Sequence, residues 1–397
     1  MKALEGITVV AASLAESGPV CTQILAFLGA DVIHIERPSD MIYNRYKGQI
    51  IRHSNKKCVL LNTKLEEGKE VMWKLLEKAD VFFENFAPGA WDRMGFSYEA
   101  VKKRNPSIIY CSLKGFAKAS QWGDCITYDP VAACSGGSAS VCGYEDMYPM
   151  LCGINVADSG GAIHAAMAIT VAILNRKITG KGMYLETPMQ NAVAAECRPF
   201  FAEYYANGGK VRRAGNAYRG LHPYAPHNIY ACQGPDVTGN FVVIDCGPDK
   251  NDEYFEKLCK AMGREDLLAD PRYATALLRY ENRLALDVEI TKWTEKYTKQ
   301  TIMEKLAKEA GVPCGAVNSM EDICRDPFLN TTIMQHMPDP NCGDLHMPII
   351  PTNMEKHRIV AQSPGLQGSQ NEEVYKGLLG LSDEEYDALA AKHVIAI

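Results

Sequence analysis

The sequence predicts an α/β protein with a large Rossmann-like domain, built on an open parallel sheet, and a smaller α+β domain. Three observations indicate this class. Short apolar runs alternate with helix-like segments through the N-terminal half, a rhythm typical of a parallel sheet covered by helices. The 397 residues exceed what one hydrophobic core usually organises, so two domains are expected. The composition changes after about residue 228, where a strand pair precedes charged helices.

The elements of the large domain follow one another closely. Its strands are expected within 7–12, 31–36, 57–63, 80–85, 106–113 and 177–187. The first helix should begin at Ser17 as its cap and end near Gly29, because serine, an early proline and a late glycine are typical of helix ends. An amphipathic helix is expected over 66–79. A long apolar helix begins at Asp158 and runs to about Arg176.

The domain limits follow from these elements. The large domain is expected over 1–205 and again over 330–397, with a linker over 206–227 and the small domain over 228–325. Proline recurs beyond residue 340, so this tail should be irregular until a final helix that Ser382 caps.

Composition and charge exclude several classes of protein. Hydrophobic residues make up 47% and charged residues 23% of the chain, which is ordinary for a soluble globular protein. A net charge of −6 argues against general nucleic-acid binding. The start, MKALEGITVVAAS, lacks the features of a signal peptide, so a cytoplasmic location is expected. No run approaches the roughly 20 apolar residues of a membrane span, since the stretch 161–174 is short and contains His164.

The cysteine spacing does not predict a metal site, and the turn after the first strand does not predict a dinucleotide site. The fourteen cysteines are scattered, and Cys21, Cys58, Cys111 and Cys125 form no CxxC pair. Reduced, packed thiols are therefore expected and no metal site is predicted. The turn after the first strand, AASLAESGP, lacks the GxGxxG spacing that lets a backbone approach a pyrophosphate. This argues against a nicotinamide-dependent dehydrogenase.

Asp158 stands in NVADSGGAIHAAMAI, where a carboxylate, two glycines and an apolar helix follow in order. One interpretation is structural: aspartate is favoured as a helix N-cap. The other is chemical: a helix N-terminus keeps the carboxylate ionised, and the glycines leave space beside it for a bulky thioester. The residues of this segment alone leave both interpretations open.

A second candidate cluster is basic. Arg37, Lys64, Arg93 and Lys114 each stand at or just past the end of a predicted strand. The carboxyl ends of parallel strands meet at one edge, where ligands bind. Together these side chains suit the phosphates of a nucleotide-like ligand, whereas each alone is typical of a solvated surface charge.

Taken together, many segments in one order resemble the family III CoA-transferases, the family of formyl-CoA transferase and carnitine CoA-transferase. They include GPVCTQILAFLGADVIHIERP, LNTKLEEGKE, ENFAPGAWDRMGFSYEAVKKRNPSIIYCSLKGF, TYDPVAACSGG, VADSGGAIHAAMAI, RKITGKG and AMGREDLLADPRYAT. The resemblance implies a transferase of sulfur-containing groups in which Asp158 is the nucleophile and forms a covalent aspartyl intermediate. CoA and acyl-CoA are then substrates, and no cofactor is permanently bound.

The resemblance also implies the CoA contacts and the assembly. The positions that match CoA contacts of the family are Ala15, Glu16, Arg37, Leu61, Lys64, Asn85, Phe86, Arg93, Met94 and Tyr128. Members form interlocked homodimers in which each ring-like subunit threads through the other. The implied partners are acyl-CoA and small carboxylic acids, with neither nucleic acid nor membrane.

Two departures from the family matter. Ile126 stands where formyl-CoA transferase has a lysine, which bears on one contact with CoA. The glycine-rich lid is represented by GNAYRGLHPYAP, and this bulkier segment implies a different acyl pocket. The bulkier side chains Tyr218, Leu221, Tyr224 and Pro226 favour an apolar or aromatic acid over formate or oxalate. The resemblance adds 2-hydroxy acids, which some members of the family activate.

Two alternative functions remain open at this point. An α-methylacyl-CoA racemase recruits a histidine shortly before the tyrosine that matches Tyr128, but Asp124 stands there and no histidine lies nearby in the sequence. A noncatalytic acyl-CoA-binding protein is the other alternative.

Overall fold

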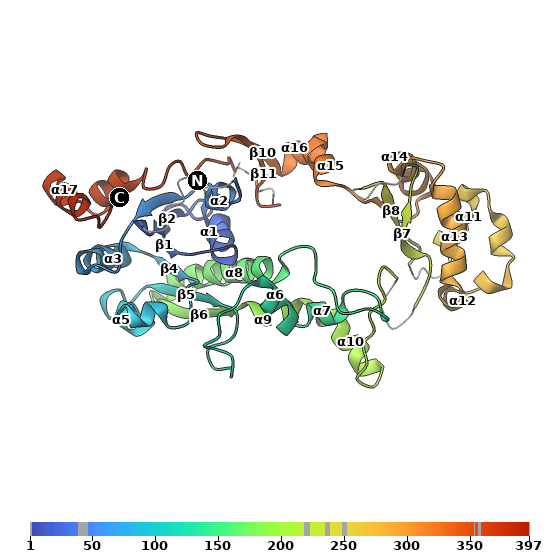
Figure 1. Cartoon of the computed structure of the whole chain (residues 1–397), viewed down its shortest axis with the longest axis horizontal. Coiled ribbons are helices and arrows are strands. Elements are labelled where there is room, and N and C mark those ends of the chain that lie inside the picture. The colour runs from blue at the N-terminus through green and yellow to red at the C-terminus, as the bar shows by residue number, and fades with distance from the viewer. Residues whose placement is uncertain are drawn as a thin grey trace. The chain divides into compact units, whose positions relative to one another are not determined.

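The computed structural model describes residues 2–38, 47–217, 223–234, 239–247, 252–352, 354–355 and 359–396 (Figure 1). It divides into two compact units. The larger comprises Met1–Ser138, Leu151–Cys197 and Pro327–Ile397, and the smaller comprises Ala139–Met150 and Arg198–Asp326. The segments 139–150 and 198–205, both inside the stretch 1–205 assigned to the large domain, thus group with the smaller unit. The sequence-based domain limits themselves stay predictions.

Six parallel strands form the sheet of the larger unit in the order β3-β2-β1-β4-β5-β6. The strands are β1 Thr8–Ala12, β2 Asp31–Glu36, β3 Lys57–Leu60, β4 Val81–Glu84, β5 Ile109–Lys114 and β6 Met183–Pro188. Val10 of β1 pairs with Ile33 on one side and Phe82 on the other. This order is that of a Rossmann-type sheet, in which successive strands are added on one side of β1 up to β3 and then on its other side from β4. The predicted α/β class with an open parallel sheet is confirmed.

Helices cover both faces of this sheet (Figure 1). On one face, Val9 and Ala11 pack with residues of α1 (Ser17–Phe27), α8 (Val156–Thr179) and α9 (Met189–Glu196). On the other, Val10 and Ala12 pack with α3 (Glu66–Lys78), α5 (Tyr98–Arg104) and the C-terminal segment. Side chains alternate across a strand, so both faces are apolar, as in a sheet buried on both sides. The remaining helices of this unit are α2 Lys47–His53, α4 Ala90–Arg93, α6 Asp129–Ser135, α16 Pro327–Thr332, η5 Glu373–Leu378 and α17 Asp383–Ala391.

Two helix starts differ from prediction. Glu16, not Ser17, is the N-cap of α1, and Ser17 is the first helical residue. α8 begins at Val156, two residues before Asp158. In contrast, Ser382 caps α17 as predicted, and its side chain and that of Glu385 form a reciprocal capping box.

Helix α8 is long and apolar enough to cross a membrane by length and composition, contrary to the expectation that no segment reaches that length. The helix extends at both ends beyond the apolar stretch seen in the sequence. Half of its apolar window is buried, and its alanines and Ile169 lie in the core against the sheet. A core helix of a soluble protein passes the same test, so the length is weak evidence for a span.

The C-terminal tail is more regular than expected. A hairpin, β10 (Met334–Asp339) paired with β11 (Gly343–Pro348), replaces the first part of the predicted irregular tail. Beyond it, the tail covers the β3 edge of the sheet: Cys58 N donates to Gln370 Oε1 over 2.9 Å, and Leu60 N donates to Asn371 Oδ1 over 2.9 Å. These side chains satisfy backbone donors that an edge strand otherwise exposes.

The smaller unit contains an antiparallel sheet in the order β7-β8-β9, with β7 His227–Ala231, β8 Phe241–Asp245 and β9 Cys314–Ala316. Tyr230 and Ile244 pack there with Leu258 and Ile290 of the flanking helices. Its helices are α10 Arg198–Ala206, α11 Glu253–Met262, η2 Glu265–Leu268, η3 Pro271–Tyr273, α12 Ala276–Glu281, α13 Arg283–Thr294, α14 Lys299–Met303, η4 Glu304–Ala310 and α15 Met320–Arg325; α7 Ser138–Val141 bridges the unit boundary.

Candidate active site

The residues proposed to meet a ligand follow the carboxyl ends of the parallel strands. Ala15 and Glu16 follow β1, Arg37 follows β2, Leu61 and Lys64 follow β3, Asn85, Phe86, Arg93 and Met94 follow β4, and Tyr128 follows β5. Because the strands are parallel, these loops meet at one edge of the sheet. Most of these residues line one of two hollows at that edge.

The first hollow, of about 360 Å³, contains Asp158. Its other lining residues are Leu14, Ala15, Ser17, Asn85, Phe86, Ala87, Pro88, Leu113, Lys114, Gly115, Phe116, Gly123, Cys125, Ile126, Thr127, Tyr128 and Met189. Asp158 is buried at 9% exposure, and most of the surrounding wall is apolar. A single carboxylate therefore lies within a largely apolar enclosure of the larger unit.

Asn85 organises the loop that faces Asp158. Its Oδ1 accepts from Leu14 N over 2.8 Å, and its Nδ2 donates to Leu14 O over 2.9 Å and to Ser17 Oγ over 3.4 Å. Ala15 in this loop has a φ of 60°, in the left-handed region that is strained for any residue but glycine. The two-way bond to Leu14 holds this conformation in place, with Ser17 beside Asp158.

Asp158 is the third residue of α8 and does not cap it, so the N-cap interpretation is wrong. Asp129 binds the start of the helix instead, because its Oδ1 accepts from Ala157 N over 2.8 Å and from Asp158 N over 3.0 Å. Burial and the negative charge of Asp129 raise the pKa of Asp158 from 3.8 to about 6, while a hydrogen bond with Ser17 acts in the opposite direction. Asp158 is a carboxylate made more basic by its surroundings.

The two glycines after Asp158 serve packing. A Cβ atom on Gly160 would lie within 2.4 Å of Glu196 Oε1, and one on Gly161 would lie 2.9 Å from Met189 Cγ. Both neighbours belong to α9. The glycines therefore face α9, and the interpretation that they leave space for a thioester beside Asp158 stays a prediction.

The second hollow, of about 230 Å³, is cationic. Arg37, Lys64 and Arg93 line it together with Ala12, Ile35, Thr63, Phe86, Ala90, Trp91 and Met94. The guanidinium of Arg37 lies 5.6 Å from the ring centre of Phe86, within range of a cation–π contact. Phe86 lines both hollows. Three of the four predicted basic residues are thus brought together, next to the hollow of Asp158.

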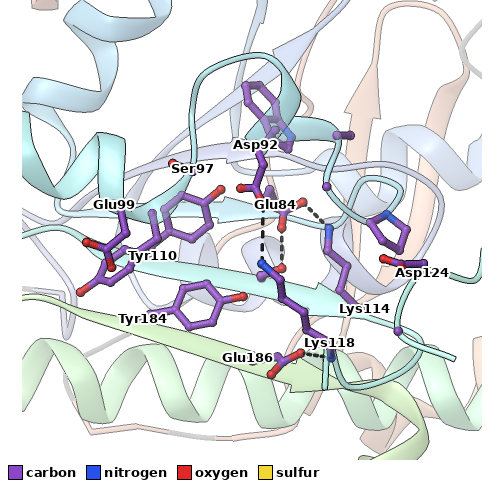
Figure 2. A pocket seen from close by; sticks show the side chains of 17 residues that line it. Glu84, Asp92, Ser97, Glu99, Tyr110, Lys114, Lys118, Asp124, Tyr184 and Glu186 are labelled. Atoms are coloured by element: carbon purple, nitrogen blue, oxygen red, sulfur yellow. Dashed lines mark hydrogen bonds and ion pairs between the residues drawn. The ribbon is translucent and has the colours of Figure 1, made fainter. Parts of the chain in front are cut away.

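Lys114, the fourth, is separate and already neutralised. Its Nζ lies 2.5 Å from Glu84 Oε2 and donates to Phe86 O over 2.6 Å. Figure 2 shows this pair at the wall of a third hollow, of about 440 Å³, where Glu84 also accepts from Ser112. Asp158 does not line this third hollow. Lys114 is the single cationic side chain among the described residues that line the hollow of Asp158.

Other residues singled out in the sequence lie elsewhere or are engaged. Glu16 pairs with Arg52 of α2 over 2.7 Å. Leu61 has no exposed surface and packs in the core, so the structure does not bring it to either hollow.

The expected lid is only partly described. Tyr218 and Leu221 lie outside the described residues. Tyr224 is 4% exposed in the smaller unit, and its hydroxyl donates to Asp245 Oδ1 over 2.9 Å. In this conformation it is a packed side chain and not an exposed lid residue.

Sequence reasoning missed three groups around Asp158. These are Ser17 and Arg52, which act on its pKa, and Asp129, which also binds its backbone. None of the three left a signal, because an aspartate before a proline at a helix start predicts a cap for its own helix, whereas Asp129 binds the backbone of α8. Among the described residues, no group of three or more histidine, cysteine, aspartate or glutamate side chains gathers to hold a metal ion.

With this geometry in view, comparison with known proteins decides the family. A family model described as CoA-transferase family III matches residues 4–370. The chain belongs to this family. As a family III CoA-transferase, it is 35% identical to a formyl-CoA:oxalate CoA-transferase from Streptomyces avermitilis, over 99% of this chain and 100% of that one.

Two further relatives agree. A formyl-CoA:oxalate CoA-transferase from Escherichia coli O157:H7 is 34% identical over 99% of each chain. The crystal structure of a CaiB/BaiF family protein from Brucella suis superposes with a TM-score of 0.83 at 28% identity, over 95% of this chain and 99% of the other. The family III chain is accordingly an enzyme of the CoA-transferase class.

Proposed function

We propose that this family III enzyme moves CoA from an acyl-CoA donor to a free carboxylic acid through a covalent aspartyl intermediate on Asp158. The observation that carries the proposal is the position of Phe86, which lines both the cationic hollow and the hollow of Asp158. Arg37, Lys64 and Arg93 suit the phosphates of CoA. The thioester of the same molecule then lies toward Asp158.

The reaction begins when an Asp158 carboxylate oxygen attacks the thioester carbonyl, and the C–S bond breaks to give an acyl anhydride and a CoA thiolate. The thiolate attacks the Asp158 carbonyl, which yields an aspartyl-CoA thioester and releases the donor acid as a carboxylate. The acceptor carboxylate attacks this thioester and frees the thiolate again. Thiolate attack on the acceptor's acyl carbon gives the new acyl-CoA and regenerates Asp158. Binding of CoA holds the reacting atoms at close range.

The acceptor is proposed to be an apolar, aromatic or 2-hydroxy monocarboxylic acid. Leu113, Phe116, Ile126 and Met189 line the hollow of Asp158, and its one described cation, Lys114, is paired with Glu84. A second carboxylate, as in oxalate, finds no uncompensated positive charge on this described wall, and burying it there is costly. The two relatives named for oxalate are therefore guides to the reaction class and not to the acid.

We expect the purified enzyme to use 4-methylpentanoate or phenyllactate with kcat/KM at least roughly tenfold above that for oxalate. New thioesters formed from a panel of acyl-CoA donors and free acids are measured by mass spectrometry. Ile126→Lys should raise the use of oxalate relative to the apolar acids, because it adds a cation to the wall. An enzyme that prefers oxalate at every donor contradicts this acyl class.

The racemase alternative lacks support at the site. That reaction needs a base on each face of the α-carbon, and no histidine is among the described residues that line the hollow of Asp158. An Asp158 substitution also separates the proposed enzyme from a noncatalytic acyl-CoA-binding protein. The enzyme would lose its turnover, whereas the binding protein has none to lose.

A homodimer of the interlocked kind is part of the proposal. Ile163, Met167, Val171, Leu174 and Ile178 recur on α8 at helical spacing, and each is at least 58% exposed in the single chain. Such a stripe suits a protein interface. The cytoplasmic location expected from the sequence stays a prediction.

Sedimentation at micromolar concentration is expected to give a mass near twice the 43.8 kDa of the chain. Val171→Asp places a charge within the stripe and should shift the protein toward the monomer. A wild-type monomer of 43.8 kDa contradicts the dimer and leaves the apolar stripe without this explanation.

A further inference from the structure

We propose that Asp129 is a positioning residue for CoA transfer: its carboxylate holds the first turn of α8 and keeps a negative charge beside Asp158. The inference rests on the proposed function of Asp158 and adds a second carboxylate to it. Asp129 acts through Asp158 and is not assigned any contact with a substrate.

The geometry comes from two helices far apart in sequence. Asp129 is the first residue of α6, directly after its cap Tyr128. One oxygen, Oδ1, accepts from both Ala157 N and Asp158 N, over 2.8 and 3.0 Å. The cap residue of α8, Asn155, makes no side-chain capping bond. The first four N–H groups of a helix have no partner within it. Asp129 provides the acceptor for two of them, Ala157 N–H and Asp158 N–H, and thereby fixes the backbone at Asp158.

The charge of Asp129 has a separate effect from its hydrogen bonds. A helix N-terminus stabilises a carboxylate at its start, but Asp129 already occupies the backbone donors there. The negative charge of Asp129 and the burial of Asp158 itself both disfavour the ionised form of Asp158. A carboxylate held in this way is more basic and hence a better nucleophile than one that the helix end stabilises fully.

Several other charged groups surround Asp158. Glu16, just before α1, raises the pKa of Asp158, whereas Arg52 of α2 lowers it. Glu196 of α9 lies against Gly160, and Lys114 at the end of β5 is paired with Glu84. Burial is the largest contribution to the raised pKa, and Asp129 is the next. Asp129 differs from Glu16 and Arg52 in that it also accepts a hydrogen bond from the backbone N–H of Asp158.

The reaction removes the unfavourable contact between the two carboxylates. In the anhydride and in the aspartyl-CoA thioester, Asp158 carries no charge, because the negative charge leaves first on the CoA thiolate and then on the donor carboxylate. Repulsion from Asp129 is therefore present in the free enzyme and absent in both covalent species. Asp129 consequently favours the acylated enzyme over the free carboxylate.

Asp129→Asn separates the two effects, because an amide oxygen still accepts both N–H bonds while the charge is lost. Free Asp158 must be ionised to attack, so kcat/KM falls as pH drops through its pKa of about 6. In Asp129→Asn we expect this acid limb to move to lower pH by roughly one unit. The fraction of enzyme held as a hydroxylamine-sensitive acyl species during turnover should fall by roughly tenfold, which corresponds to that shift.

Two further variants complete the test. Asp129→Ala also loses the backbone bonds, so its unfolding temperature should fall below that of Asp129→Asn. Asp124→Asn removes a carboxylate from the same connection between β5 and α6 without touching Asp158, and its acid limb should match that of wild type. The role of the charge is overturned if kcat/KM falls at the same pH in wild type and Asp129→Asn and both proteins hold the same fraction of acyl-enzyme.

The failure of this inference is distinct from failure of the proposed function. If the hydroxamate forms on Asp158 in wild type while Asp129→Asn behaves identically, only the role of Asp129 is lost. If Asp158 is never labelled and its asparagine variant turns over, the covalent mechanism fails and the inference fails with it.

Discussion

Asp158→Asn is expected to lower kcat by roughly four orders of magnitude or more, as removal of the nucleophile does in other covalent enzymes. A carboxylate oxygen can form the anhydride with an acyl group, whereas the side-chain amide is a far weaker nucleophile. Asp158 is buried among apolar side chains, and the amide has nearly the same size, so the fold should be retained. Initial rates of thioester exchange, with binding of CoA followed in parallel by calorimetry, measure the two effects separately.

Chemical trapping provides the direct evidence for the intermediate. Wild type incubated with acyl-CoA and then hydroxylamine should carry a hydroxamate on Asp158, located by fragment-ion sequencing of the tryptic peptide 119–176, which also contains Asp129. Asp129 is the matched control, since it is a neighbouring carboxylate that is not acylated in the proposed mechanism and should remain unmodified. An active asparagine variant together with an unlabelled Asp158 under turnover would contradict the covalent mechanism and return attention to proton abstraction.

Arg93→Ala and Arg37→Ala should each raise the KM for both donor and acceptor thioesters by one to two orders of magnitude. A charge-assisted hydrogen bond to phosphate contributes roughly 1.5 to 3 kcal/mol, and each 1.4 kcal/mol is roughly a factor of ten in affinity. The KM for the free carboxylic acid should change less, because that substrate has no phosphate. Steady-state kinetics with each substrate varied in turn tests this pattern.

Arg104 offers a matched control for these substitutions. It is an arginine of the same unit whose guanidinium lies 4.2 Å from the ring centre of Trp73 and which pairs with Glu77. It does not line the cationic hollow, so Arg104→Ala should leave the thioester KM unchanged. Equal KM values for wild type and Arg93→Ala would remove Arg93 from the CoA site.

The sequence by itself determined the local elements of this protein well. The apolar run 31–36 matches β2 residue for residue, and the amphipathic pattern over 66–79 matches α3 to within one residue. Both are set by side-chain periodicity, which is a local property. The hairpin of β10 and β11 was missed because proline and short polar residues obscure the strand pattern in this part of the chain.

The sequence also indicated where a ligand site would form. Parallel strands bring their carboxyl ends to one edge, so residues that follow different strands were expected to meet. Arg37, Lys64 and Arg93 do meet there, as expected. Lys114 also reaches this edge and lines the hollow of Asp158, but it does not join the other three because Glu84 on the neighbouring strand binds its ammonium group.

Only the tertiary structure decided how Asp158 is held and what surrounds it. In the sequence, the local pattern around Asp158 fits both a helix cap and a nucleophile, and the resemblance to the family was needed to favour the nucleophile. The pairing with Asp129 arises because α6 packs against α8. The hydrogen bond with Ser17 and the charge effect of Arg52 come from α1 and α2, which are far from Asp158 in the sequence. Burial and the charges of distant segments set the pKa of a carboxylate, and neither is encoded in the residues next to it.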